Sequence, residues 1–277
     1  MTGEDLARVL GTFRRQMAML RVLRFTAAAL LVLAVAVLPQ IEAIPTQAML
    51  AVLLGGLILI GLLGIHSFRL AREVQAGGVL MSIGKLDDAE VWLRRGLIRF
   101  GLSGRAKIMA ARLLASLLHQ RGAYEEAAAV CRTLLGQPLK RLREVAVEAR
   151  LLLADSLLLL GRLGEAHEAL TPVYGLPLSL EARIRLLPIQ LRYELAAGHA
   201  ALAASALKEK VRIATLMDSP RAALTHALLA EACRQRDMPA ERDFLAERAR
   251  LYHDLEALAR EYPVIGPIAT GVGGNVK

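Results

Sequence analysis

One short pattern recurs along this chain of 277 residues and constrains the fold more than any other feature. Ten-residue copies begin at Gly84, Gly122, Gly161 and Gly198, and a weaker copy begins at Asp237. Successive copies are 37 to 39 residues apart, and each lies between two apolar segments of helical periodicity. A fixed period of this length is typical of stacked supersecondary units, so the pattern predicts a series of helix pairs.

Composition supports a helical fold. Hydrophobic residues make up 55% of the chain but aromatic residues only 4%, so leucine and alanine must supply the packing. Sheets draw instead on β-branched and aromatic residues. The expected fold class is therefore all-α, with about four to five helix pairs in a solenoid between residues 69 and 262.

The copies resemble tetratricopeptide repeats. The best match is GAYEEAAAVCRTLLGQP, with a turn glycine, an aromatic residue, a small alanine and a closing proline. The positions that carry the resemblance are Gly84, Ala89, Gly122, Tyr124, Ala127, Pro138, Gly161, Ala166, Pro177, Gly198 and Ala203. The period is longer than the family's usual length of about 34 residues, and Arg242 replaces the alanine of the fifth copy. A general α-solenoid of helix pairs therefore stays open as the alternative.

The resemblance implies a protein-binding role, with the first helix of each pair lining a concave surface. Aligning the copies places ten polar side chains near that surface. They are Arg112, Ser116, His119, Gln120, Glu148, Asp155, Arg185, Arg192, Glu231 and Arg234. Charges of both signs suit a polar peptide or protein surface. A clamp for a C-terminal carboxylate built from asparagines is excluded, since the single asparagine is Asn275 in the tail.

Two uncharged runs precede the repeats. One has 17 residues between Arg24 and Glu42, and the other has 26 residues between Glu42 and Arg69. Runs of this length predict a transmembrane helical hairpin over residues 25–68, with spans at 25–41 and 46–67. The alternatives are a cleaved signal peptide and a buried core hairpin. The second run, which follows the first directly, argues against the signal peptide, and the length of the uncharged runs argues against core helices.

The flanking charges predict an orientation. Arginines precede the first run and follow the second, while the connecting turn carries Glu42. The positive-inside rule then places both termini on the cytoplasmic side of a bacterial inner membrane. Membrane lipids are expected among the partners. Residues 1–24 are expected to form an amphipathic helix, either at the lipid interface or as an extension of the first span. Residues 263–277 are expected to form a flexible glycine-rich tail.

Motifs for catalysis or for cofactors are absent from the sequence. Gly84 and Lys85 resemble the end of a phosphate-binding loop, but Val79 and Leu86 stand where that motif requires glycine and Ser or Thr. The six histidines form no H-E-x-x-H pair, and the two cysteines match no metal or redox spacing. We therefore expect no catalytic, cofactor-binding or metal-binding residue. The net charge is +9, but so few aromatic residues argue against nucleic acid as a partner.

The leading functional expectation is a membrane-anchored scaffold or adaptor that binds protein partners, or helps to assemble a membrane complex, on the cytoplasmic face. The rival is a structural protein that self-associates as a homo-oligomer and shapes or coats a membrane. A membrane-tethered enzyme is a third reading with no supporting group of residues.

Overall fold

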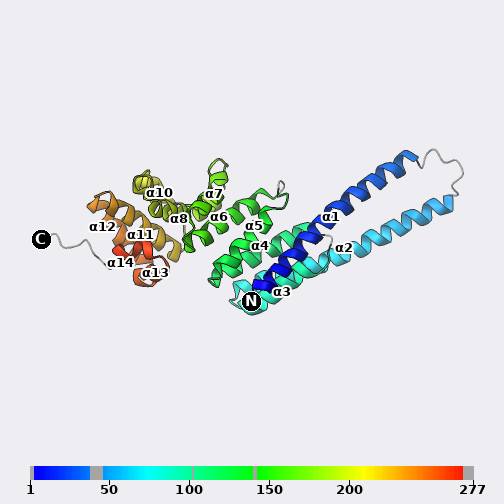
Figure 1. The fold of residues 1–277 in the computed structure, drawn as a ribbon, viewed down its shortest axis with the longest axis horizontal. Coiled ribbons are helices and arrows are strands. Elements are labelled where there is room, and N and C mark those ends of the chain that lie inside the picture. The colour runs from blue at the N-terminus through cyan, green and yellow to red at the C-terminus, as the bar shows by residue number, and fades with distance from the viewer. Residues whose placement is uncertain (1–2, 38–45, 102, 140–141, 271–277) are drawn as a thin grey trace. The chain divides into compact units, whose positions relative to one another are not determined.

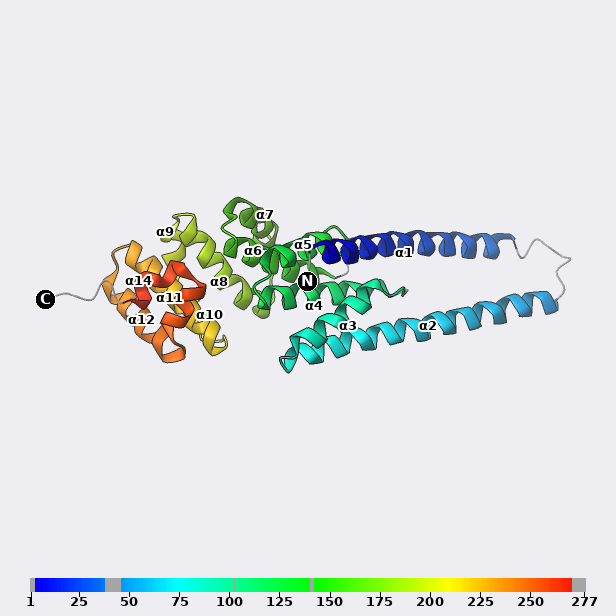
Figure 2. The same ribbon diagram turned by 60° about the horizontal axis from the view of Figure 1, so that its bottom comes forward.

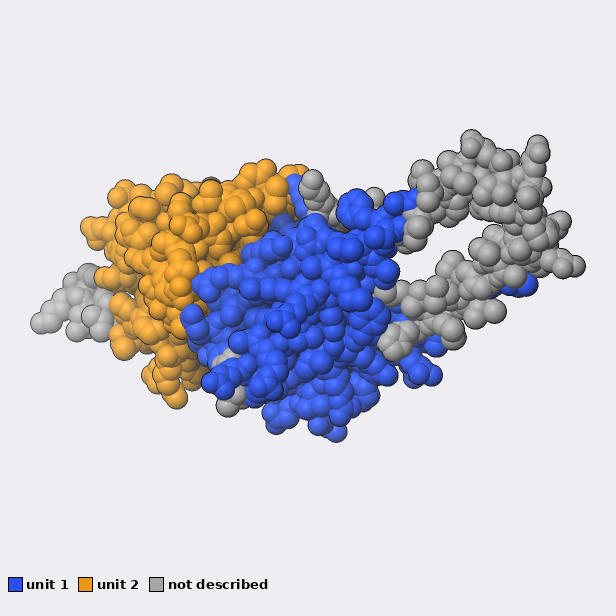
Figure 3. Space-filling model, turned by 45° about the vertical axis from the view of Figure 1, so that its right-hand side comes forward, with its two compact units in different colours: residues 1–149 blue, residues 150–277 orange. Residues whose placement is uncertain are grey.

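The computed structural model describes residues 3–37, 46–101, 103–139 and 142–270. All regular secondary structure in these ranges is helical, and they contain no strand (Figure 1 and Figure 2). The chain divides into two compact units, residues 1–149 and residues 150–277 (Figure 3). The helical fold class expected from composition therefore holds for the described residues.

The helices follow one another with short connections. The first unit contains α1 (Gly3–Val37), α2 (Thr46–Ser82), α3 (Leu86–Ile98), α4 (Gly104–Gln120) and α5 (Tyr124–Leu135). Helix α6 (Arg143–Leu159) begins in the first unit and ends in the second. The second unit continues with α7 (Leu163–Tyr174), α8 (Leu180–Ala196), α9 (Ala200–Ala204), α10 (Leu207–Ala214), α11 (Ser219–Gln235), α12 (Pro239–Tyr252), α13 (Leu255–Glu261), the 3-10 helix η2 (Pro263–Ile265) and α14 (Gly266–Ala269).

Each of the five copies of the sequence pattern forms a backbone turn of the same type. The four glycines at the turns have φ between +73° and +79°, and Asp237 has φ of +56°. In each turn the following residue donates its N–H to a carbonyl five positions back, at N···O distances of 2.7 to 3.0 Å. The glycine or aspartate donates to a carbonyl three positions back. This is the Schellman arrangement, which satisfies the last carbonyls of a helix with backbone donors alone.

Each turn joins the two helices of a pair. The first helices are the end of α2, then α4, α6, α8 and α11, and the second helices are α3, α5, α7, α9 and α12. The alanines five positions after the turn glycines are fully buried at 89, 127, 166 and 203. Leu93, Cys131 and Leu170, four positions further along, are also fully buried. Small side chains at the crossing let the helices approach closely, and larger ones beside it fill the core.

The second helix of the fourth pair is interrupted. Helix α9 has five residues and ends at Ala204, and α10 begins at Leu207 after Ala206 takes a left-handed φ of +48°. The interruption leaves the last carbonyls of α9 without helical donors. Lys210 Nζ donates to two of them, Leu202 O at 2.7 Å and Ala203 O at 2.9 Å.

The first half of α1 packs against the other helices of the first unit. Its apolar stripe is buried, with Phe13 fully covered, and the helix contacts α3, α4 and α5. The stripe consists of Leu6, Val9, Leu10, Phe13, Met17 and Leu20. The side chains that the sequence placed at a lipid interface, or on an extended span, are therefore covered by protein.

The predicted transmembrane hairpin is wrong. In the part of the chain that the structure describes, no helix is both long and apolar enough to cross a membrane. Helix α1 begins at Gly3 and ends at Val37, so the 13 uncharged residues after Arg24 are the end of a longer helix. They measure about 20 Å along the axis, compared with roughly 30 Å of hydrocarbon core. Helix α2 begins at Thr46 and continues through Arg69, Arg72 and Glu73 to Ser82.

The membrane localisation and the orientation of the termini were derived from that hairpin, and they are corrected with it. The physical reason lies in the helix ends. An uncharged run does not mark where a helix starts or stops, because intrahelical hydrogen bonds continue through arginine and glutamate as readily as through leucine. The predicted turn between the spans falls at residues 42–45, outside the described residues.

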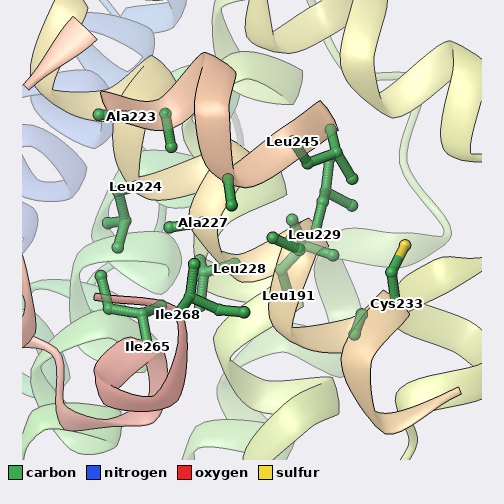
Figure 4. Packing of buried hydrophobic residues seen from close by; sticks show 14 of the residues in the cluster. Leu191, Ala223, Leu224, Ala227, Leu228, Leu229, Cys233, Leu245, Ile265 and Ile268 are labelled. Atoms are coloured by element: carbon green, nitrogen blue, oxygen red, sulfur yellow. The ribbon is translucent and has the colours of Figure 1, made fainter. Parts of the chain in front are cut away.

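The core of the second unit is built around α11 (Figure 4). Twelve consecutive residues of this helix, from Ala222 to Cys233, are buried, and Leu191 of α8 and Leu245 of α12 pack against it. Ile265 and Ile268, from η2 and α14, complete this core with exposures of 0% and 4%. Residues 263–270, which the sequence assigned to a flexible tail, are therefore helical turns that cover α11, while residues 271–277 lie outside the described ranges.

Candidate functional site

The ten polar side chains expected to face a partner divide between the two units. In the first unit they are Arg112, Ser116, His119 and Gln120 on α4 and Glu148 on α6. In the second unit they are Asp155 on α6, Arg185 and Arg192 on α8, and Glu231 and Arg234 on α11.

The first group contains an ion pair between neighbouring first helices. The guanidinium of Arg112 donates to the carboxylate of Glu148, 36 positions along the chain and close to one repeat period. The His119 ring meets the Tyr124 ring edge-on, with centroids 5.3 Å apart. Ser116 is half-buried, and Gln120 is exposed. The structure therefore brings Arg112 and Glu148 together and leaves Gln120 accessible on the same helix.

The second group repeats this arrangement one period later. Arg192 of α8 donates to the carboxylate of Asp155 on α6, and only 8% of the Arg192 side chain is exposed. The guanidinium also lies over the ring of Tyr262, 4.7 Å from its centroid, which stabilises the cation further. Burial, with a smaller contribution from Asp155, raises the pKa of the Tyr262 hydroxyl. Tyr262 was not identified from sequence because it follows α13, outside every repeat copy.

The other charged members are paired within their own helices. Glu231 is 2% exposed and accepts from Arg234 Nη2 at 2.7 Å and from Gln235 Nε2 at 2.8 Å. The hydrogen bond to Glu231 raises the pKa of Arg234. Arg185 forms an ion pair with Glu181 on the same helix, with 2.7 Å between Arg185 Nη2 and Glu181 Oε1. Most charges of the predicted surface are thus satisfied internally, which fixes their side chains in place and lowers the ordering cost of binding.

A buried lysine links three helices of the first unit, and sequence reasoning missed it. Lys107 of α4 is fully buried and donates to Leu97 O at 3.0 Å, to Arg99 O at 2.8 Å and to Gln16 Oε1. Gln16 of α1 in turn donates to Ile98 O at 2.7 Å. Lys107 therefore caps the C-terminal end of α3 and ties α1 to it. Burial lowers the pKa of Lys107 to about 8.

The two cysteine thiols and the Tyr174 hydroxyl are held in their protonated forms. Burial raises the pKa of the Cys131 thiol to about 12 and that of the Cys233 thiol to about 11. Burial also raises the pKa of Tyr174 to about 12. A nucleophilic thiol requires the opposite shift. In the described ranges, no three His, Cys, Asp or Glu side chains gather as a metal site would require.

One buried polar side chain has no partner for its ring nitrogens. His226 of α11 is fully buried, and neither Nδ1 nor Nε2 makes a hydrogen bond. Its ring stacks on Tyr252 of α12, with centroids 5.7 Å apart. Burial, reinforced by the positive charge of Arg248, lowers the pKa of His226 to about 4. The imidazole is therefore neutral at physiological pH and acts as a stacking group.

Comparison with family models, with curated proteins and with solved structures gives no match to this chain. Its functional interpretation therefore depends on its own geometry.

Proposed function

We propose that this chain is a non-catalytic scaffold that binds other proteins through helix pairs similar to tetratricopeptide repeats. The observation that carries the proposal is the backbone turn that recurs five times at a nearly constant period, with a buried alanine at four of the crossings. Stacked helix pairs of this kind present extended surfaces for binding proteins or peptides.

The binding surface would be the polar face of the first helices within each unit. Arg112 pairs with Glu148 in the first unit and Asp155 pairs with Arg192 in the second, and each ion pair holds its own part of the surface in a defined arrangement. Exposed polar groups beside them, among them Gln120, are positioned to meet a partner. A partner with a polar surface of mixed charge fits this face better than an apolar ligand. The raised pKa values of the buried thiols support a role without nucleophilic catalysis.

The test is affinity purification of the full-length chain, carrying a terminal tag, from the cells that produce it. We expect one or more other proteins at stoichiometric amounts. Gln120→Glu changes an exposed position of the face, so it should reduce the recovered partner severalfold. The matched control is Lys208→Glu on α10, an exposed position outside the face, which should leave recovery unchanged.

Recovery of this chain alone at stoichiometric level would contradict the scaffold proposal. That result would instead favour the rival expectation, a structural protein that assembles with its own copies. Equal loss of partner in the Gln120 and Lys208 variants would contradict the assignment of the binding face while leaving the scaffold role intact.

A further inference from the structure

One side of α2 is exposed over about four helical turns. Its five residues are three or four positions apart, a spacing that places them in a straight row along one side of a helix. Leu70 and Val74 lie on the opposite side, where they are 1% and 6% exposed. The three large apolar residues of the row are between 55% and 65% exposed. We call this row the α2 seam, and it consists of Ile65, Phe68, Arg72, Gln75 and Val79.

The later first helices bury the residues that correspond to the α2 seam. Arg72 is 12 positions before its turn residue, Gly84. The residues 12 positions before the other four turns are between 0% and 8% exposed, and they are Ala110, Ala149, Leu186 and Thr225. Val79 is five positions before Gly84, and its fully buried counterparts in α4, α6 and α11 are Leu117, Ser156 and Ala232. The exposed side of α2 therefore corresponds to a buried side of the later first helices.

In α4 this side packs against the preceding helix pair. Leu113 and Ala110 occupy positions equivalent to seam residues. Leu113 Cδ1 lies 3.5 Å from the position that a Cβ atom would take on Gly78 of α2. Ala110 Cβ lies 3.8 Å from the same position on Gly96 of α3. In the second unit, α11 likewise contacts α8 and α9, the two helices of the pair before it.

The α2 seam is the open end of the helix pairs of the first unit. Helix α1 packs against α3, α4 and α5. Among the described residues, no helix pair therefore covers α2 in the way that α2 and α3 cover α4. Terminal repeats in stacked arrays expose a side of this kind. A helix that docks there continues the packing that the chain already uses between its own pairs.

Arg72 determines what kind of helix fits the seam. Docking buries its guanidinium at a position where the later first helices have alanine, leucine or threonine. A buried guanidinium is costly unless a carboxylate pairs with it. The charged residues of α2 are Arg69, Arg72 and Glu73, and Glu73 already pairs with Arg99. The docking helix must therefore supply a carboxylate of its own, between apolar side chains that cover the apolar residues of the seam.

A second copy of this chain does not meet this requirement. Arg72 is the middle residue of the seam, so antiparallel pairing of two seams about a twofold axis brings the two Arg72 side chains together. A parallel pairing in register brings them together as well. Like charges in a contact that excludes water oppose association. The charge of the seam thus favours an acidic partner over self-association.

We propose that the α2 seam binds a helix of a partner protein, one with apolar residues at heptad spacing and a glutamate or aspartate at its middle. An amphipathic helix then lies on an apolar surface, and the charge pair at Arg72 fixes its register. The inference goes beyond the proposed scaffold surface, since the seam contains none of the ten polar residues of the first-helix face.

A synthetic acidic helix tests the proposal on the purified full-length chain. The probe is a dye-labelled peptide of about 21 residues, with leucine at heptad positions a and d and glutamate at e and g. A second probe has lysine in place of every glutamate. Fluorescence anisotropy measures the Kd of each probe. We expect the acidic probe to bind about tenfold more tightly than the basic probe, or better.

Charge reversal within the seam tests where the probe binds. Arg72→Glu should weaken binding of the acidic probe by about tenfold and strengthen binding of the basic probe. Val79→Ser should weaken both, because it removes an apolar contact that the probes share. The matched control is Arg8→Glu, the same charge change at an exposed position of α1 outside the seam, and it should leave both Kd values unchanged. Circular dichroism melting verifies that each variant is folded.

Three results would overturn the proposal. The first is no binding of the acidic probe to the wild-type chain. The second is equal weakening by Arg72→Glu and Arg8→Glu, which would show attraction to a basic protein without a defined site. The third is binding to vesicles of phosphatidylcholine and phosphatidylglycerol that depends on Arg72, in place of binding to the probe, which would identify an anionic lipid surface as the occupant.

The seam and the polar face of the first helices are tested by different variants. Recovery of a partner that depends on Gln120 neither requires nor excludes binding of the acidic probe at Arg72. This proposal and the scaffold role therefore fail separately.

Discussion

At the scale of single residues, the two units differ in the surroundings that they give to a buried ionisable side chain. Both bury an ionisable side chain completely, Lys107 in the first unit and His226 in the second. Lys107 finds three oxygen acceptors, whereas the ring nitrogens of His226 find none. A buried polar group stabilises a fold when it is hydrogen-bonded and destabilises it when it is not. The two residues should therefore respond to substitution in opposite ways.

Replacing Lys107 with methionine removes the donor but keeps most of the volume. Leu97 O, Arg99 O and Gln16 Oε1 then lose their buried donor, so we expect the free energy of unfolding to fall by about 3 kcal/mol. Urea denaturation followed by circular dichroism measures the change. Lys85→Met at an exposed turn position is the matched control and should have no measurable effect. A Lys107 variant as stable as wild type would show that water satisfies these oxygens.

Replacing His226 with phenylalanine keeps the ring stacked on Tyr252 and removes two unpaired nitrogens. The pKa of His226 is about 4 in the folded chain and 6.5 as its ordinary value. The unfolded chain therefore binds more protons between these values, and stability is full above pH 6.5 and falls as pH drops toward 4. The loss attributable to this residue is roughly 3 kcal/mol.

We expect His226→Phe to raise the free energy of unfolding at pH 7 and to remove much of its decrease between pH 6.5 and 4. Denaturation curves at several pH values measure both effects. His199→Gln, at an exposed position, should leave the pH dependence unchanged. If both variants retained the same acid sensitivity as wild type, His226 would not be its source.

At the scale of elements, the recurring turn shows how much of the local structure follows from sequence. Glycine adopts a positive φ without steric cost, so four of the five turns are marked by glycine. Asp237 adopts φ of +56° at the fifth, where an L side chain is strained. Since the hydrogen bonds of all five turns are equivalent, this strain should appear directly in stability.

Exchanging the two residue types between equivalent turns tests this point. Asp237→Gly should raise the free energy of unfolding by about 0.5 to 1 kcal/mol, and Gly161→Asp should lower it by a similar amount. Thermal melts of the two variants alongside wild type provide the comparison. Opposite signs are expected, and a change of the same sign in both would show that side-chain contacts, rather than φ, set the preference.

The helix pairs could be predicted from sequence because their turns depend on one residue and its backbone. Features that depend on distant contacts could not be predicted. Nothing near Lys107 in the sequence indicates that Gln16, 91 positions earlier, completes its site. The break at Ala206 carries no glycine or proline as a signal. The ten residues of the candidate surface lie on the first helices of the pairs, but the pairing of their charges depends on contacts between helices one period apart.

At the scale of the whole molecule, the described fold extends beyond the last helix pair. Helix α13, η2 and α14 follow α12 and return to cover α11, the most buried helix of the second unit. Terminal repeats in stacked arrays expose one side that no neighbour covers, and a short additional segment can cover it. Helix α13, η2 and α14 therefore cover the core of the second unit.

Two truncations separate this covering segment from the residues beyond it. Ending the chain at Tyr262 removes Ile265 and Ile268 from the core and should lower the free energy of unfolding by about 4 kcal/mol. Ending it at Thr270 keeps both isoleucines and should change stability by less than about 0.5 kcal/mol. Differential scanning calorimetry of both chains decides between these outcomes. Equal stability of the two would show that η2 and α14 are dispensable.

The residues that follow the five turn positions are Lys85, Ala123, Arg162, His199 and Met238. Each turn is nevertheless closed by main-chain atoms alone, so the turn itself makes no demand on these side chains. Lys85 in the first unit and His199 in the second are also exposed, so both positions can change in evolution while the turn stays fixed. They offer the experimenter one attachment point in each unit for a dye or spin label that leaves the turn intact.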